Sequence, residues 1–173
     1  MSPSSSHPLS PTQRDLGEIE IASYVRDAFG PDAKAVAVAP LSGGGFASVT
    51  RVDLADGRSV VLKVGPLSET GILDYERGAI GAEARYLQLI ERHLRDAPFP
   101  KLLGHGVDAS PDGSEWLITE FVPGVALTSV EKEADQNTVR ADLGAAVAGL
   151  HTITGDHYGY DGGRACGRTW REV

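Results

Sequence analysis

Three strand-like segments follow one another between residues 34 and 64, and no helical period separates them. They read KAVAVAPL, FASVTRVDL and SVVLKVG, and each is rich in valine or other residues that favour strands. Asp56-Gly57, between the second and third, is typical of a tight hairpin because glycine tolerates the positive φ needed there. Parallel α/β folds alternate strand and helix, so this order predicts antiparallel strands instead.

Helical periods lie on both sides of these strands. Apolar residues recur at helical spacing over residues 15–29, 74–95 and 137–151, and KLLGHGV and EWLITEFV predict two further strands. The order predicts an α+β fold with a five-stranded, mostly antiparallel sheet and one helix packed on it. In the last helix, the side chains expected to face inward are Val139, Leu143, Ala146, Val147 and Leu150.

Composition excludes several classes of protein. The 16 basic and 24 acidic residues give a net charge of −8, so we expect no binding to nucleic acid or to an anionic membrane. No apolar run approaches the roughly 20 residues of a membrane helix. A lone cysteine and a start without an apolar signal core predict a cytoplasmic protein. Residues 1–14, rich in Ser and Pro, are expected to form a disordered tail.

The segment between Leu41 and Val49 contains three consecutive glycines between two strands. Backbone amides in such a loop can approach phosphate oxygens without interference from Cβ atoms. The alternative is an ordinary mobile hairpin loop, since glycine clusters alone are common. A dinucleotide fingerprint is excluded because it needs a helix directly after the glycines, whereas a strand follows here.

Lys63 and Glu83 are candidate partners. Lys63 ends the strand-like run VVLK on the same face as Val61. On the helix over 74–95, one stripe holds four Ile or Leu residues and Glu83, and a buried carboxylate there needs a cation. Glu76 is an alternative partner for the lysine. Two alternatives would leave these residues unpaired. Lys63 could simply extend to solvent at the end of its strand. The helix could also be rotated so that Glu83 faces solvent.

In this order, the segments resemble the ATP-binding half of the protein-kinase-like fold, particularly the aminoglycoside phosphotransferase and fructosamine kinase group. VVLK resembles the V-A-I-K strand, and Glu83 follows Lys63 by 20 residues, similar to the Lys–Glu pair that holds nucleotide phosphates. LITEFVPG resembles the hinge, and LGAAVAGLHTI the first helix of the second lobe. The pattern L-G-x-G-x-F-G-x-V is met at Leu41, Gly44, Phe46 and Val49, with Ser42 and Ala47 in place of two glycines.

The resemblance implies a nucleotide-binding N-lobe with one αC-type helix over residues 15–121, then a hinge and the beginning of a helical C-lobe over 122–173. It implies that Glu120 and Val122 bind the adenine edge through backbone groups. The full set of nucleotide-binding residues that it implies is Ser42, Gly43, Gly44, Gly45, Phe46, Ala47, Val49, Val61, Lys63, Glu83, Glu120 and Val122.

The chemistry of these kinases depends on a His-x-Asp loop, and no such triplet occurs in the chain. Asp161-Gly162-Gly163 matches D-x-G only superficially and reads as a glycine-rich loop. We therefore expect the first half of a family member, with no catalytic or metal-binding residue and with Mg²⁺ ligands in a missing C-lobe.

We expect the chain to be the ATP-binding portion of a small-molecule kinase. The complete enzyme would phosphorylate a hydroxyl of an aminoglycoside-, sugar- or amine-type acceptor, and this chain alone is expected to be inactive. The alternative is a truncated pseudokinase or interaction module without catalysis. Self-association through an exposed apolar face of the helix over 137–151 is also expected.

Overall fold

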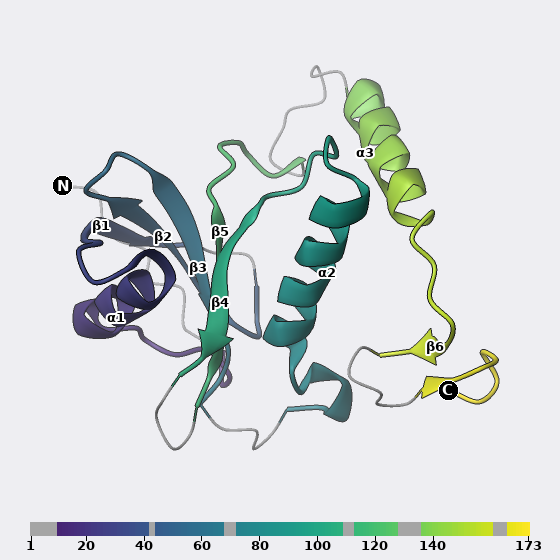
Figure 1. Cartoon of the computed structure of the whole chain (residues 1–173), viewed down its shortest axis with the longest axis horizontal. Coiled ribbons are helices and arrows are strands. Elements are labelled where there is room, and N and C mark those ends of the chain that lie inside the picture. The colour runs from purple at the N-terminus through teal and green to yellow at the C-terminus, as the bar shows by residue number, and fades with distance from the viewer. Residues whose placement is uncertain (1–9, 42–43, 68–71, 109–112, 128–135, 161–165) are drawn as a thin grey trace. The chain divides into compact units, whose positions relative to one another are not determined.

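The computed structural model describes residues 10–41, 44–67, 72–108, 113–127, 136–160 and 166–173 (Figure 1). The chain forms two compact units. The first contains Met1–Ala84 and Leu102–Phe121, and the second contains Arg85–Lys101 and Val122–Val173. Within the described ranges, no helix has both the length and the hydropathy needed to cross a membrane.

A five-stranded sheet forms the centre of the first unit. Its spatial order is β1-β2-β3-β5-β4, and all neighbouring strands are antiparallel. The prediction of an α+β fold built on an antiparallel sheet is confirmed. The strands are β1 (Ala35–Pro40), β2 (Ser48–Leu54), β3 (Ser59–Val64), β4 (Leu102–Val107) and β5 (Glu115–Glu120).

The hairpin between β2 and β3 turns at Gly57, as its sequence predicts. Gly57 has a φ of 89°, and its N–H donates to the Leu54 carbonyl at 3.0 Å. Only glycine adopts this backbone conformation at little cost. The turn sets the register in which Val49 lies opposite Lys63.

Helix α1 (Glu18–Phe29) packs on one face of the sheet and creates the main core. Side chains alternate between the two faces of a strand, so every second residue of β3 points towards α1. The rings of Tyr24 and Trp116 meet there, with centroids 5.7 Å apart. The buried residues of this core are Ile21, Tyr24, Val25, Val52, Leu54, Val60, Leu62, Val64, Trp116 and Ile118.

The opposite face of the sheet carries a smaller cluster formed with the first turns of helix α2 (Ala79–His93). Leu117 of β5 contacts Ile80 and Ala84 there, together with Ala47. The Glu115 carboxylate accepts a hydrogen bond from the Gly81 N–H at 3.0 Å, which satisfies one of the free donors at the helix start. This bond fixes the start of α2 to β5.

Helix α2 begins later than its apolar period predicts. A single 3₁₀ turn, η1 (Asp74–Glu76), precedes it, and Gly78 has a φ of 68° between the two. A residue in this left-handed conformation ends one helical segment before the next begins. The helix predicted over 74–95 is therefore shorter than expected at its start.

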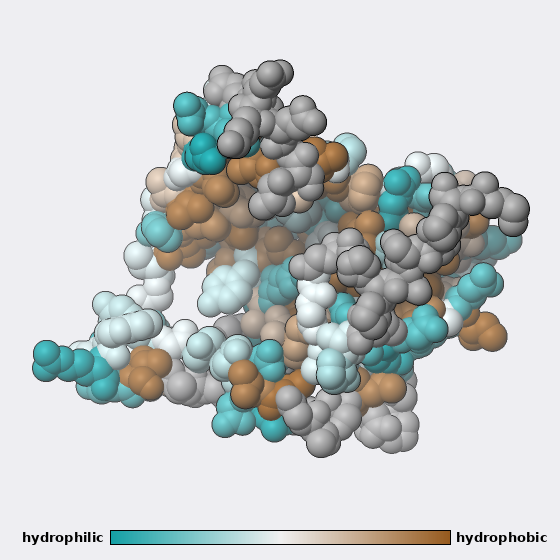
Figure 2. All heavy atoms as spheres, turned by 180° about the vertical axis from the view of Figure 1, so that it is seen from behind, coloured by the Kyte–Doolittle hydropathy of each residue, from teal (hydrophilic) through white to brown (hydrophobic). Residues whose placement is uncertain are grey.

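The second unit contains the remainder of α2, helix α3 (Gln136–Leu150) and a short ribbon of β6 (Tyr158–Gly159) and β7 (Cys166–Gly167). The bounds of α3 agree with prediction, but no residue of this helix is buried. Val139 and Leu143 are 47 % and 58 % exposed and Val147 is exposed as well, so these three do not face inward as expected, whereas Ala146 and Leu150 are half-buried. Figure 2 shows apolar side chains at the surface where α3 lies.

The structure also differs from expectation at residues 10–14, which belong to the segment predicted as a disordered tail. The Arg14 N–H donates to the Ser48 hydroxyl at 2.7 Å, and this hydroxyl donates to the Arg14 carbonyl at 2.6 Å. Tertiary hydrogen bonds hold this segment although it has few large apolar side chains. The rest of the predicted tail lies outside the described residues.

Candidate functional site

Lys63 and Glu83 form the centre of the candidate site. The Lys63 ammonium donates to both carboxylate oxygens of Glu83, each at 2.7 Å. Their side chains are 27 % and 41 % exposed, so the pair lies at the rim of the smaller apolar cluster rather than inside it. An ion pair this accessible adds at most about 1 kcal/mol to stability, so its main effect is to position the ammonium.

The structure also decides between the two carboxylates that the sequence offers to Lys63. The Glu76 carboxylate accepts a hydrogen bond from the Leu73 N–H at 2.8 Å, within its own 3₁₀ turn. Glu83 lies on α2, whose first turns are fixed to the sheet by apolar contacts and by Glu115. Glu83 is therefore the partner.

The strand face around Lys63 is half-buried and combines apolar with charged residues. Val49 and Val61 lie on this face, as the alternation of β2 and β3 requires. Arg51, opposite Val61, places its guanidinium 4.5 Å from the centroid of the Phe121 ring. No local signal in the sequence predicts this contact beside the expected hinge, because the pairing of strands brings the two residues together.

The Arg51 guanidinium is itself held in place. It donates to the Asp53 carboxylate at 2.9 Å, and the Ser59 hydroxyl donates to the same carboxylate oxygen at 2.5 Å. The pKa of Asp53 lies below its ordinary value. The hydrogen bond from Ser59 is the largest cause, and the hydrogen bond and positive charge of Arg51 add to it. Asp53 therefore remains ionised and keeps its acceptor role.

The glycine-rich loop is anchored at its C-terminal end. Ala47 is buried in the smaller cluster, and Phe46 packs against it, whereas Gly44 and Gly45 are exposed. At its base, the Leu41 N–H donates to the Val49 carbonyl at 2.8 Å. The loop thus reaches the same apolar cluster that positions Glu83. Ser42 and Gly43, the other predicted loop residues, lie outside the described residues.

The predicted hinge residues follow the end of β5. Glu120 lies opposite Val60, and the Phe121 N–H donates to the Ser59 carbonyl at 3.2 Å. Val122 is 60 % exposed and belongs to the second unit. The first unit thus brings together the described loop residues, Lys63, Glu83 and the two valines, with Glu120 at the end of the neighbouring strand.

No group of three His, Cys, Asp or Glu that could hold a metal ion occurs in the part of the chain that the structure describes. The Asp161-Gly162-Gly163 motif lies outside that part.

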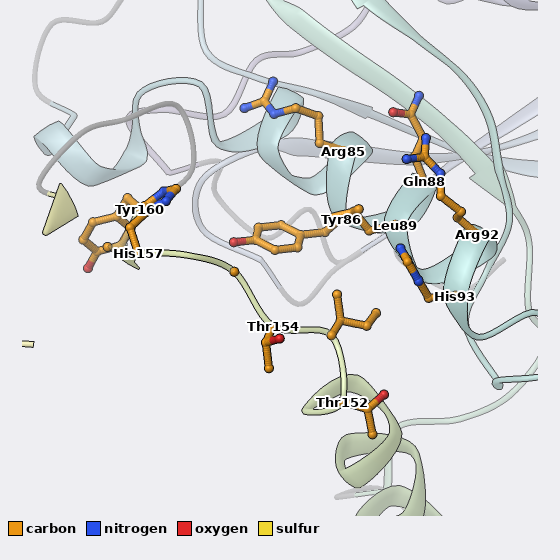
Figure 3. Close-up of a pocket in the computed structure, with 13 residues that line it drawn as sticks. Arg85, Tyr86, Gln88, Leu89, Arg92, His93, Thr152, Thr154, His157 and Tyr160 are labelled. Carbon is orange, nitrogen blue, oxygen red and sulfur yellow. The ribbon is translucent and has the colours of Figure 1, made fainter. Parts of the chain in front are cut away.

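A separate cavity of about 820 Å³ lies within the second unit, and none of the predicted site residues lines it. Figure 3 shows residues of α2 on one side and the segment that follows α3 on the other. Its described lining mixes polar and apolar side chains and includes cationic groups but no carboxylate. Its arginines and histidines are Arg85, Arg92, His93 and His157.

An antiparallel five-stranded sheet, with a lysine on its third strand paired to the following helix, defines a kinase-like fold. The family comparison agrees: the model of the phosphotransferase enzyme family matches residues 37–172. The chain belongs to this family, which confirms the resemblance seen in its sequence.

Solved structures share this fold. A candidate fructosamine-3-kinase from Thermobifida fusca YX-ER1 is 25 % identical with a TM-score of 0.52, over 82 % of this chain and 41 % of that one. A thermostable mutant of aminoglycoside phosphotransferase APH(4)-Ia, in ternary complex with AMP-PNP and hygromycin B, is 22 % identical with a TM-score of 0.56. That match covers 88 % of this chain and 47 % of the mutant, so the chain spans less than half of either protein. No curated protein matches the sequence significantly.

Proposed function

We propose that the chain is the ATP-binding portion of a small-molecule kinase. In the complete enzyme, the γ-phosphate of ATP would pass to a hydroxyl of an aminoglycoside-, sugar- or amine-type acceptor. The observation that carries this proposal is the bidentate pair of Lys63 and Glu83 on the sheet face that the glycine-rich loop adjoins. The bound AMP-PNP and hygromycin B of the related phosphotransferase support a nucleotide and a small-molecule acceptor.

Each part of the site has a role in this proposal. Lys63 neutralises phosphate oxygens, and Glu83 holds the ammonium at the required place. Phosphoryl transfer depends mainly on positioning and on neutralising charge, and these two residues supply part of both. Val49 and Val61 offer apolar surface to the adenine ring, while the Glu120 carbonyl and the Val122 N–H read its edge.

Mg²⁺ would neutralise the β- and γ-phosphate charges when bound with ATP. We propose that the base and the metal ligands belong to a part of the enzyme outside this sequence, because the chain has no His-x-Asp triplet. This polypeptide alone is then expected to bind nucleotide without transferring phosphate. Robust transfer from Mg-ATP to an amine or sugar acceptor by the purified chain would contradict that expectation.

Nucleotide-induced stabilisation tests the site directly. Thermal unfolding is followed with and without Mg-AMP-PNP for the wild type and for Lys63→Ala. A ligand at 100 times its Kd adds about 2.7 kcal/mol to the free energy of unfolding, and Lys63→Ala should lose most of this gain.

Lys34→Ala is the matched control, because it removes the same charge from an exposed lysine of the same unit. It should retain the full stabilisation by nucleotide. If the wild type gains none, or if Lys63→Ala gains as much as the wild type, the nucleotide site is refuted. The alternative of an interaction module without nucleotide would then be favoured.

A further inference from the structure

Residues 10–14 lie against the glycine-rich loop and bind three of its carbonyl groups. The Gln13 side-chain amide donates to the Gly44 carbonyl at 2.9 Å and to the Ala47 carbonyl at 3.1 Å. The Thr12 hydroxyl donates to the Gly45 carbonyl at 2.8 Å. We call residues 10–14 the strap, since they bond to both sides of Phe46.

The Gln13 amide is fully engaged. A glutamine side chain has two N–H donors and one carbonyl acceptor. Both donors bind loop carbonyls, and the acceptor receives the Ser10 N–H at 3.0 Å. These bonds fix the orientation of the amide plane. The Ser10 hydroxyl also donates to the Gly45 carbonyl, so the strap gives that carbonyl a second donor.

The strap is held independently of the loop by Arg14. Its guanidinium donates to the Ser114 hydroxyl at 3.0 Å and pairs with Glu20, and its side chain is only 15 % exposed. Ser114 is buried and donates to the Pro66 carbonyl at 3.0 Å. The strap is therefore fixed to the folded unit by contacts other than those with the glycines.

The captured carbonyls determine where the loop N–H groups point. In a trans peptide, the N–H of one residue points opposite to the carbonyl of the residue before it. Because the carbonyls of Gly44 and Gly45 point towards the strap, the N–H groups of Gly45 and Phe46 point away from it. Ser48 lies in the β2–β3 ladder opposite Val64, so its N–H group belongs to the sheet. Backbone N–H groups directed to one side of a loop form a cradle for an anion.

We propose that the strap holds residues 44–47 of the glycine-rich loop in their phosphate-binding conformation and that Gln13 is the positioning residue. This inference rests on the proposed function, because the anion is the phosphate chain of the nucleotide. Glycines lose more conformational freedom on ordering than other residues. A loop ordered before the nucleotide arrives avoids that cost during binding.

Gln13→Glu tests the proposal with almost no change in shape. The carboxylate has no donor for the carbonyls of Gly44 and Ala47 and adds a negative charge beside them. In the nucleotide-free chain, hydrogen exchange at the amides of residues 44–48 should accelerate. The Kd for Mg-AMP-PNP should rise by about tenfold, the effect expected when hydrogen bonds to a positioned group are lost.

Gln136→Glu is the matched control, since Gln136 accepts a bond from Arg140 on α3 and a carboxylate preserves that role. It should change neither loop exchange nor the Kd. Thr12→Val, which removes one donor and adds no charge, should change both in the direction of Gln13→Glu but by less.

The outcomes separate the two proposals. Unchanged exchange at residues 44–48 in Gln13→Glu refutes the strap, whether or not nucleotide binds. Faster exchange with an unchanged Kd refutes the positioning role of Gln13. Failure of the wild type to bind Mg-AMP-PNP refutes the proposed function, and the phosphate role of the strap with it, while exchange still reports whether the strap orders the loop.

Discussion

Tyr24 is buried in the main core with its hydroxyl between two carboxylates. The hydroxyl lies 3.2 Å from an oxygen of Glu20 and 3.2 Å from an oxygen of Asp108. The pKa of Tyr24 lies well above its ordinary value near 10. Burial is the largest cause, and the negative charges of the two carboxylates raise the pKa further. The folded chain therefore keeps this proton at pH values where the unfolded chain releases it.

This shift predicts a loss of stability in alkali. Above about pH 10 the unfolded state binds fewer protons than the folded state, so the free energy of unfolding falls as pH rises. Below pH 10 the contribution of Tyr24 is fully present and independent of pH. Tyr24→Phe should remove this part of the slope, as measured by urea unfolding between neutral and alkaline pH. Equal alkaline slopes for the two proteins would contradict the prediction.

Helix α1 and strand β4 approach so closely that only glycine fits at one position. A Cβ atom on Gly104 would lie 2.8 Å from the Ala28 Cβ and 3.4 Å from its Cα. These are rigid parts of the helix, so a methyl group there forces α1 away from the sheet. We predict that Gly104→Ala lowers the free energy of unfolding by about 1–3 kcal/mol, as overpacking typically does. Chemical denaturation measures this loss.

Gly144→Ala provides the matched control for this substitution. Gly144 lies within α3, and a Cβ atom there would meet nothing within 4 Å. Alanine is favoured over glycine in a helix by about 0.5–1 kcal/mol, so the same chemical change should stabilise the chain. Destabilisation of similar size at both positions would show that close packing at Gly104 is not the cause.

Elements with strong local signals could be predicted from the sequence, and those set by distant contacts could not. The strands and α1 follow from alternation, helical period and the turn at Gly57. The beginning of α2 could not be predicted, because the positive φ of Gly78 interrupts a pattern that remains periodic in sequence. The strap has no hydrophobic periodicity that could predict its conformation. It is ordered instead by polar contacts with a loop more than 30 residues away.

The same distinction applies to the candidate site. Glu83 could be paired with Lys63 because a carboxylate in an apolar helical stripe needs a cation. Gln13 gave no comparable signal, because a glutamine in a polar segment is ordinary. The contact between Arg51 and Phe121 was missed for a similar reason: the pairing of strands, not the spacing along the chain, brings these residues together.

At the scale of the whole chain, the second unit exposes an apolar face on helix α3. Helix α3 has no buried residue, and the chain spans 41 % and 47 % of two related structures. An exposed apolar surface of this kind favours association. The net charge of −8 opposes it by repulsion between copies, and salt screens that repulsion over about 10 Å at 0.1 M.

We therefore predict that the chain self-associates through the apolar face of α3, formed by Val139, Leu143 and Val147. Association should increase with protein concentration and with salt, because burial of these side chains persists while repulsion is screened. Leu143→Lys should shift the population towards monomer in sedimentation velocity. Ala141→Lys adds the same charge on the opposite side of α3 and should shift it much less. A monomer at every concentration, or equal effects of the two lysines, would show that this face does not mediate association.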